Sequence, residues 1–306
     1  MSAILFFEQG LNGIQFGLML FLLAAGLTLV FGIMDMINLA HGSLYMIGAY
    51  FMASFVQATG SFWLGLPLAL LATAVVGAAL EITLLRKLYG RDHLTQVLAT
   101  FAIILIANEI VRIVWGSQPI MLNPPAELTG PVALPGGLRY ASYRLVIIGT
   151  GTLVAVLLYL LVTKTRVGML VRAGASNREM ATAMGVDIRR LFTAVFALGA
   201  ALCALAGAML GPILAVQVGM GENILILAFV VIVIGGIGSI RGAFVGALLV
   251  GIVDTSGRAF LPIIFSTFLP PQLASAAGPA VASILIYLLM AVVLYFRPQG
   301  LFPARG

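Results

Sequence analysis

Nine apolar runs divide the chain, and each is about as long as a helix that crosses a bilayer. A transmembrane helix needs roughly twenty mainly apolar residues. Only 8% of the residues are charged, against about a quarter in soluble globular domains. The sequence therefore predicts an all-α polytopic membrane helical bundle with eight or nine membrane segments. The runs lie near residues 10–33, 41–58, 62–84, 95–115, 142–163, 191–214, 223–238, 242–262 and 276–296.

Two stretches, 34–45 and 235–242, interrupt their apolar surroundings with polar residues and glycines. Polar groups inside a membrane are costly unless they face a cavity or one another, and transporters place paired broken helices around a midplane site. We therefore expect broken helices in two pseudosymmetric halves. A tight helix crossing or an interfacial turn would explain the same interruptions without a pathway. The candidate translocation-pathway residues are Asn38, His41, Ser43, Gly235, Gly236 and Gly238.

Twelve of the sixteen Lys and Arg residues fall in loops on one side of the predicted bundle. Three lie in 85–94, six lie in 164–190, and the others are Arg241, Arg297 and Arg305. Loops rich in Lys and Arg stay in the cytoplasm, so we expect these segments and the C-terminus to be cytoplasmic. The net charge of +6 then orients the chain and does not indicate a nucleic-acid partner.

Residues 116–141 form the long loop predicted on the extracytoplasmic side. Long loops are usually functional or disordered, and this one suits either a seat for a soluble partner or a lid over the helices. With this loop and the 164–190 loop included, we expect residues 1–306 to form a single transmembrane domain. The prolines of the 116–141 loop are Pro119, Pro124, Pro125, Pro131 and Pro135.

The 164–190 segment is the only long polar interruption of the chain. Ser176 and Glu179 have the S-x-x-E spacing of a capping box, which predicts that a helix begins there. Gly185 would end this helix after roughly two to three turns by adopting a left-handed conformation. Asp187 would then cap the next helix.

Within the short helix, Met180, Ala183 and Met184 share one face because they are three and four residues apart. Methionine is flexible, so two methionines on an exposed face suit a groove on a protein partner. We therefore expect a docking helix. The alternative is a solvated connector whose basic residues only orient the chain.

The chain lacks the motifs of several enzyme classes. It has no G-x-x-x-x-G-K-[ST] loop for ATP, no H-E-x-x-H zinc motif and no G-x-S-x-G nucleophile motif. We therefore expect no catalytic site, no cofactor and no metal. Glu81 and Asp254 are intramembrane acids that leave an ion relay open. Glu109 is expected to pair with Arg112, three residues on.

Four motifs follow one another along the chain: GLTLVFGIMDMINLAHGSLYMIGAY, VRAGASNREMATAMGVDIRR, GGIGSIRGAFVGALLVGIVDT and RPQGLF. Together they resemble the branched-chain amino acid ABC transporter permease family, and in particular its LivH-like subunit. The resemblance implies a pseudosymmetric helical permease of the bacterial inner membrane. It also implies an ATPase-coupling segment that contains Arg172, Ser176, Asn177, Arg178, Glu179, Met180, Met184 and Gly185.

The resemblance implies partners as well. They are a LivM-like sister permease, two cytoplasmic ATPase subunits and a periplasmic binding protein that delivers Leu, Ile or Val. ATP hydrolysis would then belong to a different chain, which agrees with the missing P-loop. Branched-chain or other apolar amino acids are the expected substrates, and an importer of urea or short amides is the alternative. A self-sufficient secondary transporter or channel and a membrane scaffold are the other classes considered.

Overall fold

The computed structural model describes residues 3–36, 38–134 and 137–302, and most of them lie in helices. This confirms the all-α class. Pro135 and Arg305 lie outside the described residues. The α-helices are α1 (Ala3–Met34), α2 (His41–Thr59), α3 (Phe62–Thr83), α4 (His93–Trp115), α5 (Ser142–Lys164), α6 (Arg166–Ser176), α7 (Arg178–Ala183), α8 (Ile188–Leu210), α9 (Met220–Gly235), α10 (Ile240–Phe265) and α11 (Pro271–Phe296).

The remaining elements are short and lie in the connections. Residues 116–141 contain two strands that pair antiparallel, and the segment is bridged to the α8–α9 connection between Ile120 and Val216. The predicted loop is therefore tied to the helices by backbone hydrogen bonds. The short elements are η1 (Leu85–Leu88), η2 (Ala126–Leu128), β1 (Pro131–Ala133) and β2 (Arg139–Ala141).

Seven helices in the described ranges are long and apolar enough to cross a membrane, namely α1, α3 with η1, α4, α5, α8, α10 and α11. Helix α9 has 16 residues, or about 24 Å at 1.5 Å per residue, which is less than the roughly 30 Å hydrocarbon core. Helix α2 does not meet the same criteria; its first turn holds the buried polar residues His41 and Ser43. The chain is a multi-pass membrane protein, and the predicted count of eight or nine segments is not confirmed.

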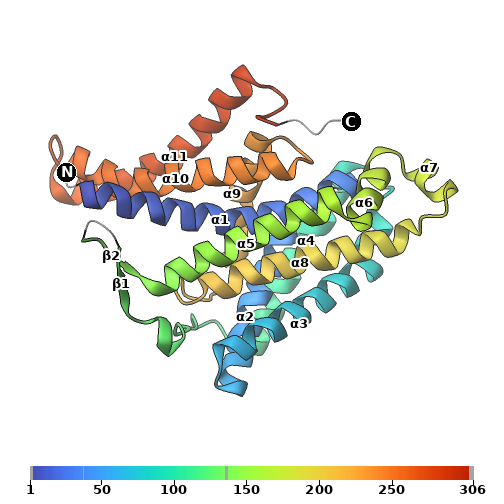
Figure 1. Ribbon diagram of the computed structural model, residues 1–306, viewed down its shortest axis with the longest axis horizontal. Helices are drawn as coiled ribbons and strands as arrows, with labels where there is room; N and C mark the ends of the chain where they lie inside the picture. The colour runs from blue at the N-terminus through green and yellow to red at the C-terminus, as the bar shows by residue number, and fades with distance from the viewer. Residues whose placement is uncertain (1–2, 37, 135–136, 303–306) are drawn as a thin grey trace.

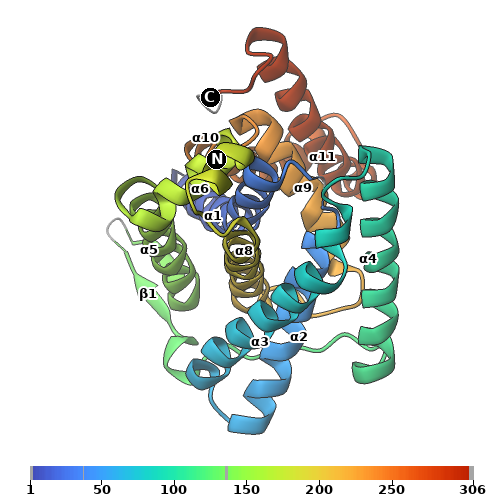
Figure 2. The same cartoon turned by 90° about the vertical axis from the view of Figure 1, so that its right-hand side faces the viewer.

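Helix α1 lies at the centre of the bundle, between α10 on one side and α5 and α8 on the other (Figure 1). Seen from the end, α1 and α8 are surrounded by α5, by α2 to α4, and by α10 and α11 (Figure 2). Residues Leu18 to Ala25 are each at most 2% exposed, so this middle part of α1 is buried on every side. Gly13 and Gly17 allow close approach to α10, since a Cβ on Gly13 would lie 2.8 Å from the Cα of Ile252.

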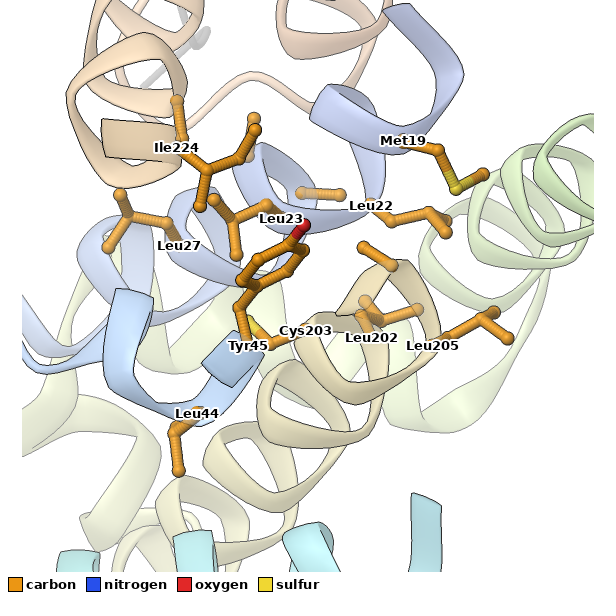
Figure 3. Packing of buried hydrophobic residues seen from close by; sticks show 14 of the residues in the cluster. Met19, Leu22, Leu23, Leu27, Leu44, Tyr45, Leu202, Cys203, Leu205 and Ile224 are labelled. Atoms are coloured by element: carbon orange, nitrogen blue, oxygen red, sulfur yellow. The ribbon is translucent and has the colours of Figure 1, made fainter. Parts of the chain in front are cut away.

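Tyr45 of α2 points into the core where α1, α8 and α9 meet (Figure 3). Its ring lies beside Leu23 and Leu27 of α1 and Cys203 of α8, all of them buried. Lipid is as apolar as these side chains, so close packing and not water exclusion holds such helices together. Tyr45 therefore fixes α2 to the central helices.

The basic connections meet at one end of the molecule. Tyr89, between η1 and α4, packs on Phe192 at the start of α8. Gly32 at the end of α1 lies against Gly238, which connects α9 and α10. The N–H of Leu301 donates to a carbonyl at the end of α9, which brings the C-terminal segment to the same end. These are the segments that the positive charges predict to be cytoplasmic.

The starts of α2 and α9 cross in direct backbone contact. Gly42 and Gly221 face each other, and a Cβ added to Gly221 would lie 2.1 Å from the carbonyl oxygen of Gly42. Only glycine permits this approach, because any side chain would separate the two backbones. The break after α1 therefore meets the α8–α9 connection inside the bundle.

Candidate functional site

Helix α7 begins at Arg178, and its N-cap is Asn177. The predicted capping role of Ser176 is wrong, because Ser176 is the last residue of α6. Asn177 is extended (φ −154°, ψ 103°), and its side-chain oxygen accepts the N–H of Met180 at 2.9 Å. Asparagine caps as well as serine does, so the helix starts one residue later than predicted. Glu179 then lies in the first turn, where its charge complements the helix dipole.

Helix α7 ends at Ala183, and Gly185 stops it. Gly185 has φ 87°, and its N–H donates to the carbonyl of Thr182 at 2.9 Å. The N–H of Val186 donates to the carbonyl of Ala181 at 3.1 Å, which completes a Schellman-type end. The predicted stop is confirmed. The helix has six residues, fewer than the predicted two to three turns, because it begins after Asn177 and Met184 is already its C-cap.

The neighbouring helices are capped as well. Asp187 accepts the N–H of Arg190 at 3.1 Å at the start of α8, which confirms its predicted role. Thr165 accepts the N–H of Gly168 at 3.2 Å at the start of α6. Each helix start in the polar segment is thus fixed by a side chain.

The predicted methionine face of α7 is exposed. Met180 is 60% exposed and Met184 is 80% exposed, whereas Ala181 on the opposite face is 4% exposed. Figure 1 shows α7 at the edge of the molecule, away from the membrane helices. Two large apolar side chains in this place are available to a partner.

Two arginines attach the segment to the membrane helices. Arg172 of α6 donates to the carbonyl of Val162 near the end of α5. Arg178 of α7 donates to the carbonyl of Ile33 in the last turn of α1 at 3.0 Å. The outward face of α7 is therefore rigidly connected to helices that enter the bundle.

The chain breaks between the end of α1 at Met34 and the start of α2 at His41. Asp35 has φ 49°, a left-handed value that is uncommon outside glycine. The side-chain oxygen of Asn38 accepts the N–H of Ala40 at 3.0 Å and turns the chain into α2. Asn38 and His41 are both 0% exposed. The break thus carries polar side chains into the interior.

The ring of His41 is enclosed at the crossing of α1 and α8. A Cβ on Gly26 would lie 2.8 Å from Nε2, and a Cβ on Gly199 would lie 3.2 Å from Cε1. Neither ring nitrogen of His41, nor the side-chain nitrogen of Asn38, has a hydrogen-bond partner within the described part of the chain. Buried polar atoms without partners are costly. Such atoms need a partner, for example an ordered water.

Ser43 lies two residues after His41 and therefore on the opposite side of α2. There it lines a narrow crevice between α2, α4 and α9. Asn108 of α4 donates to the carboxylate of Glu222 on α9 at 2.6 Å across this crevice. The structure therefore separates Ser43 from the His41 side of the break.

Gly235, Gly236 and Gly238 form a close backbone crossing away from His41. A Cβ on Gly235 would lie 2.3 Å from backbone atoms of α10, and one on Gly236 would lie 2.7 Å from the carbonyl oxygen of Phe302. Gly238 packs against Gly32, six residues or about 9 Å along α1 from Gly26. This packing matches the alternative of a tight helix crossing.

Residues 10–294 match a known protein family, the branched-chain amino acid transport system permease component. The chain belongs to this family. The match covers the break after α1, the capped α7 and the glycine crossing, and it confirms the family resemblance. It contains three of the four motifs, and the fourth, RPQGLF at 297–302, follows it.

Several curated permeases are similar along most of their length. The chain is 30% identical to the high-affinity branched-chain amino acid transport system permease protein BraD of Pseudomonas aeruginosa, over 97% of this chain and 95% of BraD. It is 30% identical to the permease protein LivH of Escherichia coli, over 84% of this chain and 87% of LivH. It is 28% identical to LivM of Escherichia coli, over 92% of this chain and 67% of LivM. No solved structure matches the chain.

One polar cluster of this permease was not predicted. Glu81 is 0% exposed and accepts from the Arg86 guanidinium at 2.9 Å, the Tyr89 hydroxyl at 2.7 Å and the Thr193 hydroxyl at 2.6 Å. The signal available in the sequence was a lone acid in an apolar run that is followed by a basic residue and a tyrosine. That signal does not identify Thr193, which lies on α8 and is 112 residues away.

The predicted pair between Glu109 and Arg112 is confirmed. The side chains are 2.9 Å apart on α4, and both are more than half exposed.

Proposed function

We propose that this permease is the translocation subunit of an ABC importer in the bacterial inner membrane and that it carries branched-chain or other apolar amino acids. Its curated relatives are named for branched-chain amino acid transport, which supports this substrate class. Residues 1–306 would act as one permease domain, with 164–190 in the cytoplasm and 116–141 outside. Separate ATPase subunits would supply the energy, since the sequence has no P-loop.

The capped, exposed helix α7 carries this proposal. A helix of six residues is unstable alone in water, and here caps and arginine contacts hold it in place. Its two exposed methionines would insert into a groove on an ATPase subunit, and Glu179 would lie at the rim of that groove. The proposed coupling residues are Arg172, Ser176, Asn177, Arg178, Glu179, Met180, Met184 and Gly185.

The proposed pathway follows the break after α1. The unpaired nitrogens of Asn38 and His41 support it, because water or substrate would satisfy them in an open state. Rocking of the bundle between outward-open and inward-open states would expose this region. The further proposed pathway residues are Ser43, Gly235, Gly236 and Gly238.

The proposed complex contains a LivM-like sister permease, two ATPase subunits and a periplasmic binding protein in a lipid bilayer. The similarity to both LivH and LivM supports a pairing of two related permeases. Co-purification from solubilised membranes tests it. An isolated chain that transports leucine alone in vesicles would instead support a secondary transporter.

Substitution on the outward face of α7 tests the coupling function. In the assembled complex, Met184→Trp or Glu179→Lys is expected to leave membrane insertion intact and to abolish the ATP turnover that substrate-loaded binding protein stimulates. Turnover at the wild-type rate would refute the assignment.

Matched controls exist on the predicted extracytoplasmic side. Met121 is 70% exposed, and Glu127 is exposed in η2. Met121→Trp and Glu127→Lys introduce the same changes far from α7. Without binding protein, these two variants should retain the wild-type rate of ATP turnover, and the two α7 variants should not. Competition with excess urea tests the substrate: labelled leucine uptake should be unaffected, and inhibition would favour the urea or amide alternative.

A further inference from the structure

Arg178 connects α7 to two membrane helices at once. It donates to the carbonyl of Ile33 in the last turn of α1 at 3.0 Å. The same guanidinium lies over the ring of Phe192, 5.4 Å from the centroid, near the start of α8. A cation over an aromatic face is attracted by the ring quadrupole. A displacement of α7 therefore acts on both helices through one side chain.

Phe192 also contacts the connection between η1 and α4. It is 3% exposed, and Tyr89 meets its ring edge to face with centroids 5.5 Å apart and planes at 80°. Tyr89 lies between η1 and α4, so the two rings join α8 to that connection. Phe192 is buried and Tyr89 is half-buried. Movement of one ring should displace the other, because protein interiors are packed without free space.

Glu81 of α3 is the last residue in this series of contacts. It accepts the hydroxyl of Tyr89 at 2.7 Å, the guanidinium of Arg86 at 2.9 Å and the hydroxyl of Thr193 at 2.6 Å. Burial, together with the hydrogen bond to Glu81, raises the pKa of the Tyr89 phenol, so the hydroxyl stays protonated and donates. Hydrogen bonds to a charged carboxylate are strong. Glu81 therefore holds α3 and α8 to the aromatic pair.

We propose that Arg178, Phe192, Tyr89 and Glu81 form a relay that transmits displacement of α7 to α1, α3 and α8. The inference rests on the proposed coupling function and adds the route into the membrane. Its contact on α1 lies two residues before Asp35, where the chain turns left-handed and the break leading to α2 begins. The four side chains are positioning residues, since they act through the helices.

The test compares leucine transported per ATP hydrolysed in proteoliposomes that contain the complete importer. Phe192→Leu keeps an apolar side chain and removes the ring, and Arg178→Ala removes both of its contacts. Each is expected to lower this ratio by about twofold to thirtyfold, the range of measured couplings between linked sites. The double variant should fall no further than the stronger single one, because both break the same series of contacts.

Matched variants separate transmission from simple folding defects. Tyr89→Phe keeps the ring contact, so it should transport more leucine per ATP hydrolysed than Tyr89→Leu. Arg190→Ala removes an exposed arginine that pairs only locally with Asp187, and it should leave the ratio unchanged. Complex assembly and ATP turnover without binding protein should be preserved in Phe192→Leu, in both Tyr89 variants and in Arg190→Ala.

Two results overturn the relay. In the first, Phe192→Leu and Arg178→Ala both transport as much leucine per ATP hydrolysed as the wild type, and transport by the wild type depends on ATP. The other is a double variant whose loss is the product of the two single losses. If the wild-type complex itself shows no dependence on ATP, the proposed function fails instead, and the two failures are thereby distinguished.

Discussion

The imidazole of His41 lies directly against the backbone of Gly26, so α1 has no room for a side chain at this point. A Cβ on Gly26 would come within 2.8 Å of Nε2, and a Cβ on Gly199 would lie 3.2 Å from the adjacent Cε1. The buried ring is therefore held by two glycines of helices that belong to different parts of the sequence.

Gly26→Ala should displace the His41 ring or separate α1 from α8. We expect a lower thermal unfolding temperature of the purified permease and a loss of leucine uptake by the assembled importer, with about 1–3 kcal/mol lost to overpacking. Gly10→Ala is the control, since nothing lies within 4 Å of its Cβ and alanine favours helix. Equal stability of the two variants would contradict the glycine enclosure.

Gly185→Ala should weaken the end of α7. The left-handed backbone at φ 87° costs an alanine about 1–2 kcal/mol, whereas asparagine tolerates it better. Tryptic cleavage at the neighbouring exposed residues Arg189 and Arg190 should therefore be faster in Gly185→Ala than in Gly185→Asn. Gly90→Ala, with an ordinary backbone and open space around it, should be cleaved at the wild-type rate.

Asn177→Ala should destabilise the start of α7 by about 1 kcal/mol, the typical contribution of an N-cap. Ser176→Ala should have little effect, because Ser176 ends α6 and does not cap α7. Hydrogen exchange at the amide of Met180 measures the difference, since that amide donates to Asn177. Faster exchange in Ser176→Ala than in Asn177→Ala would restore the capping box.

The start of α4 should loosen in acid. The side-chain hydroxyl and the N–H of Thr95 donate to Asp92 and lower the pKa of its carboxyl. A carboxyl with a lowered pKa stabilises the folded form above its ordinary pKa, and the stabilisation is lost as the pH falls through the lowered value. Exchange at the Thr95 amide, corrected for its intrinsic pH dependence, should rise in that range. Asp92→Asn should remove the pH dependence.

The start of α7 marks the limit of prediction from sequence. Ser176 and Asn177 are both good caps, and the S-x-x-E spacing favours the first. The position at which α6 ends decides which of the two residues caps α7. Helix ends vary by one or two residues without a local signal. The stop at Gly185 was predictable because a left-handed position after a helix strongly favours glycine.

The buried sites differ in the same way. His41 and Asn38 could be selected from the sequence, because polar residues in an apolar run attract attention wherever they pack. The relay could not, since Tyr89 and Phe192 are ordinary aromatic residues and their contact joins segments about a hundred residues apart. Long-range pairs of this kind are created by the fold and have no local pattern.

Gly42 and Gly221 place backbone against backbone, and the Cβ of Leu225 lies beside Gly42. Surfaces with interdigitated ridges must separate before they shift, whereas two smooth backbones slide past each other and keep most of their dispersion energy. The junction of α2 and α9 therefore allows the two helices to slide against each other, and a bulky residue at either glycine would force the helices apart.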